Sequence, residues 1–130
     1  MRRRTFVGGV FAGLAATAYG AKPPKPKAGD IPRRVFGKTG QKLTVIGQAG
    51  GRFPLTSFEE AKAITLRAYD LGVNYFDNSG DYWDGRSEEV YGAVLPPFRK
   101  EVFITTKANS RTSAGAEAEL ELSLKRLRTD

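Results

Sequence analysis

The stretch "GVNYFDNSGDYWDGRSEEVYG", residues 72–92, decides the fold class that we expect. Its apolar segment "VNYFD" predicts a buried strand, and the following polar, glycine-containing segment predicts a long loop. The letters "SEEVYGAVL" then predict a helix from about Ser87 that ends before Pro96 and Pro97. A strand, a loop and a helix in this order make one βα unit.

A similar unit precedes this stretch. Residues 33–47, "RRVFGKTGQKLTVIG", predict a β-hairpin that leads into a buried strand over residues 44–47. In residues 55–72, Ser57 and Glu60 form a predicted capping box, and Gly72 occupies the expected C-terminal cap. The expected apolar face of that helix consists of Ala61, Ile64, Ala68 and Leu71.

A third unit follows, with a strand at "VFITTK" and a helix at "SAGAEAELELSLKRL", where Leu120, Leu124 and Leu127 share one face. Val45, Asn74 and Phe103 occupy similar places in the three strands and are 29 residues apart each time. This spacing predicts an α/β protein with a parallel sheet, either doubly wound or part of a (β/α)8 TIM barrel.

A complete barrel of this kind needs about 250 residues. The chain has 130 residues, and three strands cannot close a barrel. We therefore expect the N-terminal portion of a (β/α)8 barrel, a hairpin plus about three βα units, in a C-terminally truncated chain. An open sheet edge would then make it prone to aggregate.

The first residues have the composition of an export signal. "MRRRTFVGGVFAGLAATAYGA", residues 1–21, begins with arginines, continues with an apolar stretch and ends in small residues. "RRTFV" resembles the twin-arginine motif, so we expect a periplasmic or exported protein that meets the twin-arginine machinery. An ordinary secretory signal is the alternative. Thirteen apolar residues span about 20 Å as a helix, too short for a stable membrane span.

Residues 22–32, rich in proline and lysine, predict a linker, and residues 33–130 a single domain. The net charge of +7 lies mostly in residues 1–30, which carry +5, so we expect no nucleic-acid partner. The chain contains neither Cys nor His. Because these are the usual thiolate and imidazole ligands, we expect no metal site, and chemistry must come from Asp, Glu, Tyr, Lys or Ser.

Three side chains are the candidates for catalysis. Asp77 ends the second predicted parallel strand and Lys107 ends the third, and such strands run about 4.8 Å apart. Tyr82 follows in the loop and can fold back over the same opening. A nearby ammonium favours a phenolate, so Lys107, steadied by Asp77, would help Tyr82 to give its proton to a carbonyl oxygen. The alternatives are a turn cap, a solvated lysine and a loop tyrosine over a core.

The candidates for cofactor binding are Gly50, Gly51 and Arg52, together with Asp77. The glycines of "GQAGGRFP", residues 47–54, would let the backbone approach a ligand, although the segment lacks the order of a dinucleotide fingerprint. None of the three catalytic candidates can supply hydride, so a nicotinamide would be needed. Trp83 is expected to line the mouth of the site or to pack in its loop.

These segments resemble the aldo-keto reductase family. "RVFGKTGQKLTVIG", "GVNYFDNSGDYWDGRSEEVYG" and "VFITTK" match its opening hairpin, its Asp and Tyr segment and its lysine strand. The resemblance implies a (β/α)8 barrel that reduces aldehydes and ketones with NADP(H), less often NAD(H). It makes Asp77, Tyr82 and Lys107 members of the Asp-Tyr-Lys-His tetrad, whose histidine is expected beyond Asp130.

The resemblance also sets expectations for this chain. Most phosphate and adenine contacts of the family come from its last βα loops, so we expect a truncated chain to be inactive and to bind NADPH poorly. "DYWDG" departs from the family's Tyr-Gly and leaves the shape of the mouth open. Two alternatives to a reductase are a nucleotide-binding regulatory or sensor subunit and a non-catalytic exported interaction module.

Overall fold

The computed structural model describes residues 29–130, so the predicted signal and most of the linker lie outside the described residues. The first elements are β1 (Arg33–Val35) and β2 (Lys42–Thr44), which pair antiparallel as the expected hairpin. The buried Asn74 fastens this hairpin to the rest of the fold. Its Oδ1 accepts from the Thr44 backbone N at 2.8 Å, and its Nδ2 donates to the Lys42 carbonyl at 2.9 Å.

The predicted parallel sheet is present, in the order β3-β4-β5. Its strands are β3 (Gln48–Ala49), β4 (Tyr75–Asp77) and β5 (Phe103–Thr105). Each strand lies beside the one that precedes it in the chain, and both pairs are parallel. All three strands therefore end at the same edge of the sheet.

The predicted position of the first parallel strand is wrong. Val45 and Ile46 lie in an exposed bend, and the strand begins at Gln48. In register, Gln48 lies opposite Phe76, and Phe76 opposite Ile104, so the true repeat is 28 residues. The two segments can be confused because "LTVIG" is as apolar as a buried strand.

Helix α1 (Phe58–Asp70) begins at the predicted capping box, in which Ser57 and Glu60 each bond the backbone N of the other. Gly72 follows the helix with a φ of 95°, as expected for a glycine at this cap. The predicted apolar face is only partly correct. Ala61 and Thr65 are buried, whereas Ile64 and Leu71 are exposed.

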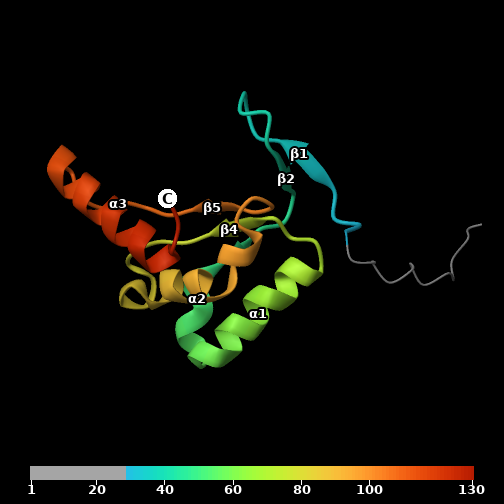
Figure 1. Ribbon diagram of the computed structural model, residues 1–130, viewed down its shortest axis with the longest axis horizontal. Helices are drawn as coiled ribbons and strands as arrows, with labels where there is room; N and C mark the ends of the chain where they lie inside the picture. The colour runs from blue at the N-terminus through green and yellow to red at the C-terminus, as the bar shows by residue number, and fades with distance from the viewer. Residues whose placement is uncertain (1–28) are drawn as a thin grey trace, which may run out of the picture.

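Helix α2 (Arg86–Val94) and helix α3 (Ser113–Leu127) occupy the predicted segments. Short 3-10 helices η1 (Gly50–Leu55), η2 (Tyr82–Gly85) and η3 (Pro96–Phe98) complete the fold. Figure 1 shows α1 and α2 side by side on the same side of the parallel strands. On α3, Leu127 is buried, whereas Leu120 is 49% exposed.

The core lies between the parallel strands and the helices. Phe76 of β4 and Tyr91 of α2 are fully buried, and their rings pack edge to face with centroids 5.6 Å apart. Phe53 of η1 packs against the same Tyr91 ring at 5.7 Å. This packing holds the strand ends and the start of η1 in fixed relation. Among residues 29–130, no helix has both the length and the apolar character needed to cross a bilayer.

Candidate active site

Asp77 and Lys107 form an ion pair where β4 and β5 end. Asp77 is the last residue of β4, opposite Thr105, and Lys107 lies two residues beyond β5. The Lys107 Nζ donates to Asp77 Oδ1 at 3.0 Å and Oδ2 at 2.9 Å, and to the Asn78 carbonyl at 2.6 Å. The predicted ion pair between Asp77 and Lys107 is therefore present, although the third strand ends two residues before Lys107.

Tyr82 lies over the same strand ends, as expected. It is the first residue of η2, and the Lys107 Nζ lies 5.0 Å from the centroid of its ring. A methyl group added at Gly51 would lie 3.4 Å from the Tyr82 ring carbons Cε2 and Cζ. The ring thus lies close to both Gly51 of η1 and Lys107, and the structure brings Asp77, Tyr82 and Lys107 together.

Electrostatics keep the lysine charged. Partial burial acts to lower the pKa of Lys107, but the hydrogen bond and negative charge of Asp77, with a smaller contribution from Tyr82, raise that pKa above its ordinary value. Lys107 therefore stays an ammonium at neutral pH. A fixed positive charge beside a phenol favours the phenolate that would remain after proton donation.

Two further contacts at this site were not predicted from the sequence. Thr105 Oγ1 donates to Asp77 Oδ1 at 2.9 Å, so Asp77 is oriented by its neighbour strand as well as by Lys107. Asn78 is fully buried, and its backbone carbonyl accepts the shortest of the three hydrogen bonds from Lys107. The parallel register that sets Thr105 opposite Asp77 could have suggested the first contact, but a backbone carbonyl leaves no signal in the sequence.

Trp83 belongs to a turn whose backbone conformation residues other than glycine rarely adopt. Trp83 and Asp84 have φ of 58° and 53°, in the left-handed region that favours glycine. The Trp83 ring contacts the Arg86 guanidinium, 4.7 Å from the ring, and the Phe58 ring, with centroids 6.4 Å apart. Trp83 therefore packs against α1 and α2, which fits the expected loop packing.

Three of the four predicted cofactor-binding residues, Gly50, Gly51 and Arg52, lie at the start of η1, next to the end of β3. A methyl group at Gly50 would lie 2.9 Å from Asn78 Oδ1, so packing within the protein already requires glycine there. Gly51 faces Tyr82, and Arg52 is exposed beside it. A role of Gly50, Gly51, Arg52 and Asp77 in holding a cofactor stays a prediction.

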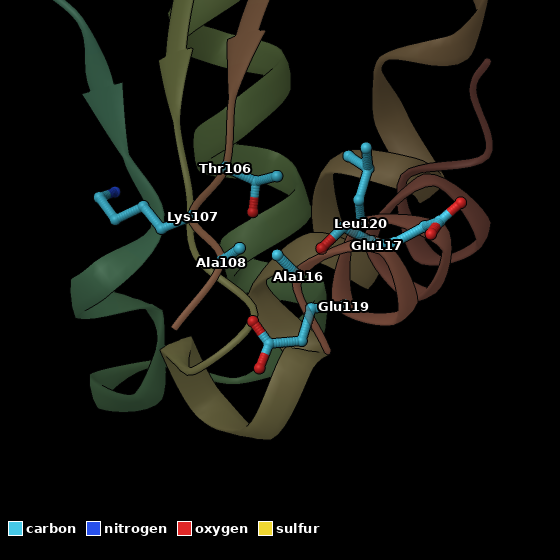
Figure 2. A pocket seen from close by; sticks show the side chains of 8 residues that line it. Thr106, Lys107, Ala108, Ala116, Glu117, Glu119 and Leu120 are labelled. Atoms are coloured by element: carbon cyan, nitrogen blue, oxygen red, sulfur yellow. The ribbon is translucent and has the colours of Figure 1, made fainter. Parts of the chain in front are cut away.

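A groove of about 420 Å³ lies between the end of β5 and α3, lined in part by Ala108, Ala116 and Leu120. Figure 2 shows Lys107 pointing away from this groove, whereas Thr106 points toward the helices. The groove is therefore separate from the Lys107 ammonium and Asp77. Within residues 29–130, no three acidic side chains come close enough to hold a metal ion.

Comparison with protein-family models identifies the family to which the chain belongs. Residues 46–130 match the model of the aldo/keto reductase family. The chain belongs to the aldo/keto reductase family. It is 32% identical over 88 residues to the L-glyceraldehyde 3-phosphate reductase of Escherichia coli, a match that covers 62% of the chain and 25% of that protein. It is 40% identical over 52 residues to a voltage-gated potassium channel subunit beta of Oryza sativa, covering 38% and 16%.

Solved structures of the family have the same fold. An aldo-keto reductase from Pseudomonas aeruginosa superposes with a TM-score of 0.71 at 30% identity, covering 82% of this chain and 45% of that one. An aldo-keto reductase from Klebsiella pneumoniae, in complex with NADPH, gives 0.58 at 28% identity, covering 70% and 34%. The predicted (β/α)8 class is confirmed, and the described residues form an N-terminal portion of it. The chain spans less than half of these solved relatives and a quarter or less of the curated ones.

Proposed function

We propose that this chain carries the proton-donating site of an oxidoreductase that reduces aldehyde or ketone carbonyls with NADP(H), or with NAD(H) as the alternative. The observation that carries the proposal is the position of one ammonium. Lys107 Nζ is held by both oxygens of Asp77 and lies 5.0 Å from the centre of the Tyr82 ring. Membership of the aldo/keto reductase family supports the assignment of these three residues.

In the proposed reaction, Tyr82 donates its phenolic proton to the carbonyl oxygen of the substrate. The hydride for the carbonyl carbon would come from a bound nicotinamide, so the product would be the alcohol. Lys107 stabilises the phenolate left on Tyr82, because an opposite charge nearby favours the ionised form. Asp77 keeps Lys107 protonated and in place, since it accepts two of its hydrogen bonds.

The residues near the strand ends suit an anionic, nucleotide-like cofactor in part. Arg52 is an exposed cation on η1, and Gly51 places backbone next to Tyr82 without a side chain between them. The NADPH complex of the Klebsiella relative supports NADPH as the nucleotide. We propose that Gly51 and Arg52 contact the cofactor near the reacting ring, and that the 130-residue chain alone binds it weakly and is inactive.

A chimaera tests this function. Residues 46–130 replace the matching part of the Pseudomonas relative, and aldehyde-dependent oxidation of NADPH is followed by absorbance. We expect turnover by the chimaera and a loss of about 10²- to 10⁴-fold on Tyr82→Phe, the usual contribution of one acid-base group, with NADPH affinity retained. Tyr75→Phe, a half-buried tyrosine whose ring lies against Phe103 and Gly47, is the control. Equal turnover by the Tyr82→Phe and parent chimaeras contradicts the proposal.

The second candidate is a nucleotide-binding regulatory or sensor subunit with the same fold. The similarity to a potassium channel subunit beta favours this alternative. It predicts a chimaera that binds NADPH with the affinity of the relative but does not turn over. A third candidate, an exported interaction module, predicts a stable, monodisperse chain that binds no nucleotide.

We propose that residues 1–21 direct export through the twin-arginine machinery and place the protein in the periplasm. The support is the order of arginines, apolar residues and small residues in that segment. This pathway carries folded proteins, so a cofactor could travel with the enzyme. A reporter fused after residue 21 should reach the periplasm, and substitution of Arg3 and Arg4 by lysine should retain it in the cytoplasm.

A further inference from the structure

Behind the candidate active site, one buried carboxylate joins three elements. Glu88 lies in the first turn of α2 and is fully buried. Its Oε1 accepts from Thr106 Oγ1 at 2.6 Å, just after β5, and its Oε2 accepts from Arg126 of α3 at 3.3 Å. The proton transfer proposed above does not use Glu88. A buried carboxylate is costly unless it is paired, so this set of contacts has a structural purpose.

Two glycines make room for the partner of Glu88. A methyl group at Gly85 would lie 2.1 Å from Cζ of Arg126, and one at Gly92 would lie 2.0 Å from its carbonyl oxygen. Non-bonded heavy atoms do not approach one another so closely, so any side chain at these positions displaces Arg126. The two glycines that bound "GRSEEVYG", residues 85–92, thus let Arg126 pack against this segment and pair with Glu88.

Thr106 connects this buried pair to the candidate active site. It precedes Lys107, and Figure 2 shows the two side chains pointing to opposite sides of the chain. Holding the Thr106 hydroxyl on the helix side fixes the backbone from which Lys107 leaves on the other side. There the Lys107 Nζ reaches Asp77 and the Asn78 carbonyl.

We propose that Glu88 is a positioning residue, which holds Thr106 so that the Lys107 ammonium is directed onto Asp77 and Tyr82. Only its consequence for carbonyl reduction rests on the proposed function. The test therefore measures the pKa of Lys107 itself, in the 130-residue chain and without cofactor.

The test is an NMR titration of the Lys107 side chain in selectively labelled protein. Thr106→Val keeps the shape of Thr106 but removes its hydroxyl, and we expect the pKa of Lys107 to fall because its contacts with Asp77 loosen. Thr106→Ser restores the hydroxyl and should restore the titration. Glu88→Asp, one methylene shorter, should lower the pKa as well and serves if Thr106→Val fails to fold.

Thr65→Val is the matched control. Thr65 is a buried threonine of α1 whose Oγ1 donates to the Ala61 carbonyl at 2.8 Å, away from Lys107. It should lose stability without any change in the Lys107 titration. An unchanged titration in folded Thr106→Val or Glu88→Asp overturns the positioning role. If Thr65→Val also lowers the pKa of Lys107, the shift follows from a general loss of stability and not from Thr106, and the positioning role is equally overturned. Neither result depends on reductase activity.

Discussion

At the scale of single residues, the ionisable groups near the strand ends have different roles because their surroundings differ. Lys107 lies partly in solvent, and Asp77 keeps its charge fixed. Tyr91 of α2 is fully buried, and its hydroxyl donates to the Gln48 carbonyl at 2.9 Å and to the Asp77 carbonyl at 3.3 Å. Tyr82 is therefore the half-buried phenol beside the lysine, and Tyr91 is the phenol that holds the ends of two strands.

Tyr91 should make the protein sensitive to alkali. Burial, with a smaller contribution from Asp77, raises the pKa of the Tyr91 phenol well above its ordinary value. In the unfolded chain this phenol ionises near pH 10. The contribution of the neutral, buried phenol to the free energy of unfolding is therefore fully present below pH 10, and it is lost as pH rises above 10. The loss is about 1.4 kcal/mol per pH unit until the folded phenol also ionises.

Urea unfolding between pH 8 and pH 11.5 measures this effect. Tyr91→Phe should be less stable than the parent at pH 8, by about 1 kcal/mol for the lost hydrogen bonds. Its stability should then fall less steeply above pH 10, so that the difference between the two proteins shrinks or reverses. Parallel curves for the parent and Tyr91→Phe over the whole range would show that Tyr91 ionises alike in both states.

At the scale of elements, the local signals decided which predictions succeeded. The capping box at Ser57 and the prolines after Leu95 gave helices where they were expected, because caps and helix breakers act within a few residues. The position of β3 could not be read in the same way. A methyl group at Gly47 would lie 2.6 Å from the Tyr75 ring, so tertiary packing, invisible in the local pattern, sets where that strand starts.

The loop after Tyr82 shows a similar limit. A sequence pattern would place glycine where the backbone is left-handed, yet Trp83 and Asp84 both adopt that conformation. Such strain persists only where surrounding contacts enforce it. Here Phe58 and Arg86 hold the Trp83 ring from α1 and α2. The pairing of Asp77 with Lys107 was predictable because parallel strands bring their ends together, whereas the turn that places Tyr82 was not.

At the scale of the whole molecule, the described residues form one open wall of a barrel. The three parallel strands leave both outer edges unpaired within residues 29–130, and Ile46 is 61% exposed at one end of this wall. Cofactor sites normally enclose 70–90% of the ligand surface. The described wall offers Gly51 and Arg52 from one side only, so most of a dinucleotide would stay in water.

We therefore expect the purified 130-residue chain to bind NADPH more weakly than about 0.1 mM, which corresponds to about −5.5 kcal/mol. Titration of NADPH fluorescence against the chain measures this affinity, with the chimaera as the positive control. Arg52→Ala should weaken binding by the chimaera if this cation contacts the cofactor, whereas Arg67→Ala, an exposed arginine in the last turn of α1, should not. Saturable micromolar binding by the chain alone would mean that one wall of the barrel suffices to recognise the nucleotide.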